Sequence, residues 1–66
     1  MPNLNECLLA EIDRNKDLLR IYKNLGPAGM FGATHIEADI KRAEQALAEQ
    51  DAVKMLEMLT VLKEKE

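Results

Sequence analysis

The first third of the chain carries apolar residues at the spacing of one helix face. They are separated by steps of three, four and seven residues: Leu4, Leu8, Ile12, Leu19 and Tyr22. This spacing predicts an amphipathic helix over about residues 4–25, with Asn3 or Asn5 as its N-cap. We expect the helix to end there because Gly26 can adopt the left-handed conformation that closes a helix and Pro27 cannot continue one.

A second helix is predicted over about residues 34–49. Thr34 is followed three residues later by Glu37, which is the spacing of a capping box, in which the hydroxyl and the carboxylate bind backbone amides at the start of a helix. Beyond this signal runs a narrow apolar stripe of Ile36, Ile40, Ala43 and Leu47. Because alanine is small, the stripe favours close packing in a hairpin with the first helix.

The end of the chain predicts a third helix over about residues 51–64, with Asp51 as its N-cap. No Gly or Pro separates this segment from the preceding one, so one long bent helix is an alternative. We prefer a turn near Gln50 because the apolar pattern widens beyond it and covers well over half of the helix circumference. The residues that widen it are Val53, Met55, Leu56, Met58, Leu59, Val61 and Leu62.

These segments predict a single all-α domain over residues 1–66, either a small helical hairpin or a three-helix domain. A domain of this size buries only roughly 60% of the surface that its unfolded chain exposes, and two helices cannot cover so wide an apolar surface on a third. We therefore expect a homo-oligomer, in which the chain binds another copy of itself. The predicted interface consists of Val53, Met55, Leu56, Met58, Leu59 and Leu62. The alternative is that all of these side chains lie inside one three-helix core.

Two polar residues interrupt the apolar face of the first helix. Glu11 and Asn15 are four residues apart and so stack on one another. One interpretation is a device that sets the register of an interface, as a single buried Asn does in coiled coils, or a gap where water enters. The other is a polar contact to a ligand inside a helical assembly.

Composition and charge exclude several classes of function. The net charge of −3, with acidic and basic residues interspersed, argues against a nucleic-acid-binding protein. Cys7 is the only cysteine and His35 the only histidine, so neither an internal disulfide nor a tetrahedral Cys/His zinc site is predicted. No apolar run is long enough for a membrane span, and the first residues lack the pattern of a signal peptide. We expect a cytoplasmic protein without a metal or a cofactor.

Residues 26–33, with the sequence GPAGMFGA, are predicted to form a glycine-rich loop. A connection between two packed helices needs only about two to five residues, so the length of this one calls for an explanation. In a structural interpretation, Met30 and Phe31 fold back as a lid on the core. In a functional interpretation, the three glycines let backbone amides approach an anion just before the second helix, where the helix dipole favours negative charge.

Basic and aromatic residues beside the loop support the functional interpretation. Lys16, Arg20 and Lys23 form one basic edge of the first helix, although such an edge is more often a solvated face. The predicted ligand-binding residues are Arg20, Tyr22, Lys23, Gly26, Gly29, Phe31, Gly32, Thr34 and His35. Among them, the two aromatic side chains would offer faces for a planar base. Paired carboxylates, a Ser-His-Asp arrangement and an HExxH motif are all absent from the sequence, so no enzyme is expected.

The heptapeptide GPAGMFG follows the tetrapeptide YKNL and precedes an isoleucine-bearing helix and a final Met-Leu helix. In this order of features, residues 22–63 resemble a family of small helical accessory proteins carried by tailed bacteriophages and prophages. The resemblance implies a non-essential accessory role, in which the protein binds a component of the host.

Two functions agree with this resemblance, beside that of a structural assembly factor. The first is a sponge, a non-enzymatic oligomer that sequesters a small anionic, nucleotide-like host defence signal such as a cyclic nucleotide. The second is a helical interaction module that inhibits or redirects a host protein. We expect the sponge because glycines, a helix N-terminus and flanking cations fit phosphates. The acidic balance and the Met-rich third helix favour the protein partner.

Overall fold

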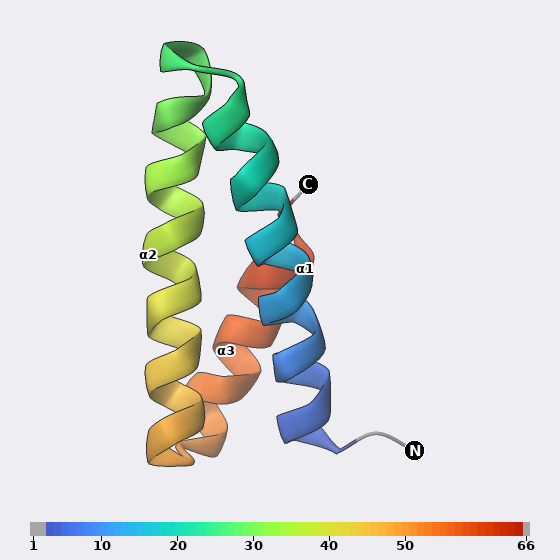
Figure 1. Ribbon diagram of the computed structural model, residues 1–66. Helices are drawn as coiled ribbons and strands as arrows, with labels where there is room; N and C mark the ends of the chain where they lie inside the picture. The colour runs from blue at the N-terminus through green and yellow to red at the C-terminus, as the bar shows by residue number, and fades with distance from the viewer. Residues whose placement is uncertain (1–2, 66) are drawn as a thin grey trace.

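The computed structural model describes residues 3–65 as three helices: α1 (Leu4–Asn24), α2 (Pro27–Glu49) and α3 (Ala52–Lys63). Helices α1 and α2 form an antiparallel hairpin, and α3 packs across its lower half, so that the end of α3 lies beside the middle of α1 (Figure 1). The predicted all-α class is therefore confirmed, in its three-helix form.

Helix α1 begins where a side-chain cap is available. Asn3 is its N-cap, and its side-chain Oδ1 accepts a hydrogen bond from the backbone N–H of Glu6 at 2.8 Å, which satisfies one of the unpaired donors of the first turn. The helix ends at Asn24, and Leu25 is its C-cap. These bounds lie within one residue of the predicted range.

The predicted glycine-rich loop over residues 26–33 is wrong, because α2 already begins at Pro27. Gly26 alone takes the unusual conformation, with φ of 75°, and Pro27 then occupies the first turn of a helix, where its missing N–H costs nothing and its ring presets φ. The predicted capping box is wrong for the same reason. Thr34 lies inside α2, and its hydroxyl donates to the carbonyl oxygen of Met30 at 2.9 Å.

The turn between α2 and α3 confirms two helices in place of one long helix. Gln50 adopts the left-handed conformation, with φ of 54° and ψ of 37°. Its side-chain Nε2 donates to the carbonyl oxygen of Leu47 at 2.6 Å, and its backbone N–H donates to the same oxygen at 3.2 Å, so both groups close the end of the helix. Asp51 is the N-cap of α3, as predicted, and accepts from the backbone N–H of Lys54 at 3.2 Å.

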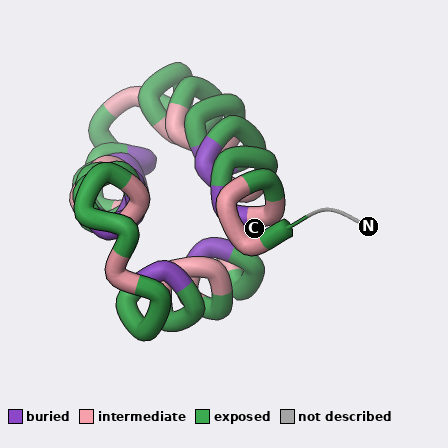
Figure 2. Tube along the Cα trace, turned by 90° about the horizontal axis from the view of Figure 1, so that it is seen from below, coloured by how far each residue is buried: buried purple, intermediate pink, exposed green. Residues whose placement is uncertain are grey.

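The core lies along the axis that the three helices share, with buried segments on their inward sides (Figure 2). Its buried members are Leu8, Ile12, Ile36, Ile40, Ala43, Ala46, Met55 and Leu62. The fully buried Ala43 shows that the small side chain of the α2 stripe permits close packing of helices, as the sequence predicts. The core thus draws on all three helices.

The structure buries some residues of the interface predicted on α3 and leaves others exposed. Met55 and Leu62 lie buried in the core, and Met58 and Leu59 pack against it while partly exposed. A single chain therefore covers more of α3 than predicted, because α3 lies across both of the other helices. The predicted interface residues that stay exposed are Val53 and Leu56.

Asn15 connects α1 to the end of α3. Its side chain is fully buried, and Nδ2 donates to the carbonyl oxygen of Leu62 at 3.2 Å and to that of Glu11 at 2.8 Å. Arg14 donates to the same Leu62 oxygen at 2.6 Å and pairs with Glu11 at 3.0 Å. These residues thus tie α3 to α1 within one chain, at a carbonyl that also accepts from the backbone N–H of Lys65 at 3.2 Å.

Candidate functional site

Two of the three glycines pack one helix against another. Gly29 is buried, and a Cβ atom added to it would overlap the carbonyl oxygen of Tyr22 and lie 2.9 Å from the Cβ of Leu25. A Cβ atom on Gly32 would overlap the aromatic ring of Tyr22. The absence of side chains here lets the start of α2 approach the end of α1. The backbone of Gly29 is therefore not open to a ligand, whereas Tyr22 and Gly32 line a shallow hollow of about 300 Å³ together with Ile36, Glu64 and Lys65.

The first turn of α2 also offers fewer donors to an anion than the sequence predicts. Pro27 has no N–H, and the N–H of Gly29 donates to the carbonyl oxygen of Gly26 at 3.0 Å. Two of the first three helical positions therefore have no free amide, although an anion site at a helix N-terminus depends on such amides. The geometry does not support a phosphate cradle at Gly26.

The basic edge of α1 is paired with carboxylates. Arg20 lies 3.2 Å from Asp17, and both side chains are about three-quarters exposed. Lys23 lies 3.8 Å from a carboxylate oxygen of Glu37, whose other oxygen lies 3.5 Å from Lys41. One carboxylate thus lies between two lysines, and the cluster of Lys23, Glu37 and Lys41 keeps a net charge of one positive unit.

The outer face of α2, opposite the core, carries an apolar surface with polar neighbours. A shallow hollow of about 420 Å³ is lined by Met30, Phe31, Thr34 and His35. Phe31 is 82% exposed and Met30 is 51% exposed, so the prediction that these two side chains form a lid on the core is wrong. An adjoining hollow of about 300 Å³ is lined by Thr34, Glu37, Ala38 and Lys41, and Thr34 belongs to both.

The structure therefore brings together only part of the predicted site. Phe31, Thr34 and His35 line one hollow. Lys23 pairs with Glu37, which lines the adjoining hollow. Lys41 was not predicted. Its signal in the sequence was the spacing of four residues from Glu37, which is typical of an ion pair on one helix face.

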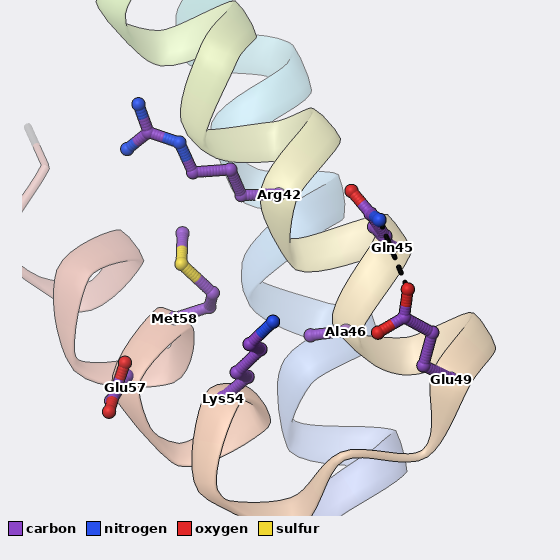
Figure 3. Close-up of a pocket in the computed structure, with 7 residues that line it drawn as sticks. All are labelled: Arg42, Gln45, Ala46, Glu49, Lys54, Glu57 and Met58. Carbon is purple, nitrogen blue, oxygen red and sulfur yellow. Dashed lines mark hydrogen bonds between the residues drawn. The ribbon is translucent and has the colours of Figure 1, made fainter.

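A separate hollow lies between the C-terminal half of α2 and the start of α3 (Figure 3). Its volume is about 230 Å³, and it is lined by Arg42, Gln45, Ala46, Glu49, Lys54, Glu57 and Met58. None of these residues was predicted to bind a ligand. Met58 was predicted only as part of the oligomer interface. The hollow is created by the chain reversal at Gln50, which a pattern within one helix cannot reveal.

Residues 3–65 contain no group of three or more His, Cys, Asp or Glu side chains arranged to hold a metal ion. Within the same residues, no helix combines the length and the apolar character needed to cross a bilayer. Comparison of the chain with protein-family models, curated proteins and solved structures finds no match. Function is therefore inferred from the side chains at these surfaces.

Proposed function

We propose that the chain is a non-enzymatic accessory protein of phage type that forms a homo-oligomer and sequesters a small anionic, nucleotide-like defence signal in the host cytoplasm. The outer face of α2 binds the base of this ligand. The proposal moves the site from the predicted loop to Phe31, Thr34 and His35, beside Lys23 and Lys41.

The observation that carries the proposal is the exposure of Phe31. This side chain is the only phenylalanine of the chain and is 82% exposed beside His35, although the core closes without it. A flat aromatic face in an apolar hollow suits a planar base, and one such stacking contact is worth about 1–3 kcal/mol. The hollow of about 420 Å³ lies in the size range of ligand sites.

The charge beside this hollow suits a phosphate group. Lys23 and Lys41 share Glu37 as their carboxylate partner, and exposed ion pairs of this kind are worth little in water. A phosphate can therefore replace Glu37 as the partner of Lys41 at small cost. Thr34 lines both hollows, and because its proton is donated to the Met30 carbonyl, its hydroxyl oxygen can accept a hydrogen bond from a ribose.

Self-association completes the site in this proposal. Exposed apolar side chains remain on α1 and α3, namely Ile21 and Leu25 at the end of α1 and Val53 and Leu56 on α3, each more than half exposed. Their burial against a second copy would remove apolar surface from water, which favours association. A second copy would also cover the open side of the shallow hollow and shield the bound ligand.

A second candidate function is a helical interaction module that inhibits or redirects a host protein. The observation that favours it is the same set of exposed aliphatic side chains, because Ile21 and Leu25 follow each other at a spacing of four residues. Such a pair on one helix face is typical of a helix that docks in an apolar groove of a partner protein.

Thermal unfolding with a panel of cyclic dinucleotides, cyclic trinucleotides and ADP-ribose derivatives tests the proposal. A ligand that binds only the folded protein raises the melting temperature with the logarithm of its concentration above Kd. We expect Phe31→Ala to weaken binding by about five- to a hundredfold, as the loss of one stacking contact predicts. Leu9→Ala, at an exposed apolar residue of α1 that belongs neither to the hollow nor to the proposed interface, is the matched control and should leave the affinity unchanged.

The two candidate functions give different outcomes in this experiment. A panel that produces no shift at millimolar ligand contradicts the sponge and leaves the interaction module. Equal effects of Phe31→Ala and Leu9→Ala on nucleotide affinity would show that the outer face of α2 is not the site.

A further inference from the structure

The hollow between α2 and α3, called the corner pocket below, has the composition of a ligand site separate from the outer face of α2. Gln50 reverses the chain, so the last turns of α2 face the first turns of α3 (Figure 3). Ala46 is 2% exposed and forms part of the floor, and the half-buried Met58 stands beside it. The small side chain of Ala46 leaves the space open, and Met58 gives it an adaptable apolar wall.

The cations of the corner pocket are incompletely neutralised by the protein. Within residues 3–65, Lys54 has no carboxylate within ion-pair distance, and its ammonium group extends toward Ala46 (Figure 3). Arg42 lies 3.2 Å from Asp39, but the same carboxylate lies 2.7 Å from the ammonium group of Lys65. One carboxylate thus serves two cations, and the guanidinium keeps the capacity to bind another anion.

One of the two carboxylates that line the corner pocket is engaged by a neighbouring side chain. Glu49 accepts a hydrogen bond from the side-chain amide of Gln45 at 3.0 Å, and Figure 3 shows this pair at the outer side of α2. Glu57 stands at the opposite edge, apart from Arg42. The lining therefore combines two cations, two carboxylates and an apolar floor.

We propose that the corner pocket binds a small organic carboxylate, whose charged end lies between Lys54 and Arg42 and whose short apolar body packs on Ala46 and Met58. A planar guanidinium matches the two oxygens of a carboxylate. The volume of about 230 Å³ equals that of roughly seven or eight water molecules, which limits the ligand to a few carbon atoms beyond the carboxylate. Inorganic phosphate fits less well because it cannot use the apolar floor and carries more charge toward Glu49 and Glu57.

Titration of the ¹⁵N-labelled protein with 3-methylbutanoate, followed by amide chemical shifts, tests this site. The neutral 3-methylbutanamide has the same shape and isolates the contribution of the charge. We expect saturable shifts at Ala46 and Lys54 with the carboxylate and at least about tenfold weaker binding of the amide, because the amide loses charge-assisted hydrogen bonds.

Charge-removing variants separate the corner pocket from the rest of the surface. Lys54→Gln and Arg42→Gln should each weaken 3-methylbutanoate binding by about tenfold or more. Both side chains are largely exposed, so these variants keep the core intact. Lys41→Gln removes a cation of α2 that lies outside the pocket. Lys41→Gln and Phe31→Ala should both leave the affinity for 3-methylbutanoate unchanged, since the corner pocket is independent of the proposed nucleotide surface.

Three results would overturn the assignment. Equal affinity for the carboxylate and the amide would show that the cations take no part. Equal loss of affinity in Lys41→Gln and Lys54→Gln would show that the carboxylate is attracted by the overall charge of the surface and is not bound in the corner pocket. Phosphate binding as tight as that of 3-methylbutanoate would show that the floor of Ala46 and Met58 makes no contribution.

Discussion

Replacement of Gly29 by alanine distinguishes a packing role of this glycine from a role in a ligand loop. In a helix interior, alanine is favoured over glycine by about 1 kcal/mol, so Gly29→Ala would stabilise the protein if nothing stood in the way. The structure places the Tyr22 carbonyl oxygen in the path of the new methyl group, with the Leu25 Cβ atom 2.9 Å away and the Tyr22 carbonyl carbon 3.0 Å away. We therefore expect the opposite sign.

The size of the loss follows from the atoms that the methyl group meets. Overpacking in a core costs about 1–3 kcal/mol and occasionally more, and here the obstacle is backbone, which cannot rotate away as a side chain can. After subtraction of the gain in helix propensity, we expect Gly29→Ala to lower the free energy of unfolding by about 2 kcal/mol or more. A domain of 66 residues has a total of only about 3–10 kcal/mol.

Urea denaturation followed by far-ultraviolet circular dichroism measures this loss. Gly32→Ala provides a graded comparison, because its methyl group meets the ring of Tyr22, which can turn aside at lower cost. The double variant Gly32→Ala/Tyr22→Leu should recover part of the Gly32→Ala loss if the ring is the obstacle. A Gly29→Ala protein as stable as the wild type, or more stable, would refute the close approach of α1 and α2.

Other contacts give smaller predicted changes in the free energy of unfolding, each measurable by the same urea titration. Asn15→Ala should lose about 2 kcal/mol because a fully buried side chain and its hydrogen bond to the Leu62 carbonyl disappear. Gly26→Ala should lose about 1–2 kcal/mol, since its φ of 75° strains any side chain although nothing stands near it. Asp39→Asn should lose about 1 kcal/mol through its ion pair with Lys65 at 2.7 Å, and molar salt should reduce the difference. Unchanged midpoints for these variants would contradict the corresponding contacts.

Signals that act within a few residues were sufficient to predict much of the fold. Asn3 and Asp51 are polar residues placed just before apolar periodicity, and both are N-caps in the structure. The turn at Gln50 was predicted from the widening of the apolar pattern, without any Gly or Pro to mark it. At each of these helix ends, the side-chain hydrogen bond that caps the helix joins residues three positions apart.

The glycine-rich segment could not be interpreted correctly from the sequence, because its conformation depends on a contact between helices. Glycine disfavours a helix by local propensity, so three glycines within seven residues predict a loop. The structure places Gly29 and Gly32 against Tyr22, where a larger residue would hold α1 and α2 apart. This packing outweighs the propensity cost, and no spacing within one segment reveals it.

The oligomer interface was predicted from the apolar pattern of one helix. That pattern does not reveal how much of the helix the rest of the chain covers. Apolar residues cover well over half of the circumference of α3, but α3 lies across both other helices and buries Met55 and Leu62 in the core. The exposure of Phe31 was equally hidden, because a lone aromatic residue carries no periodicity that assigns it to one side of a helix. The burial of Met55 and Leu62 depends on where α3 crosses the hairpin.

Native mass spectrometry of the protein purified from cells, and again after addition of cyclic nucleotides, tests the central proposal most directly. It reports the oligomeric mass and any bound small molecule together. We predict at least a dimer that retains or takes up a nucleotide-like ligand, and a Phe31→Ala protein that forms the same oligomer without the ligand. A wild-type monomer that takes up no nucleotide from the panel would contradict the proposed function.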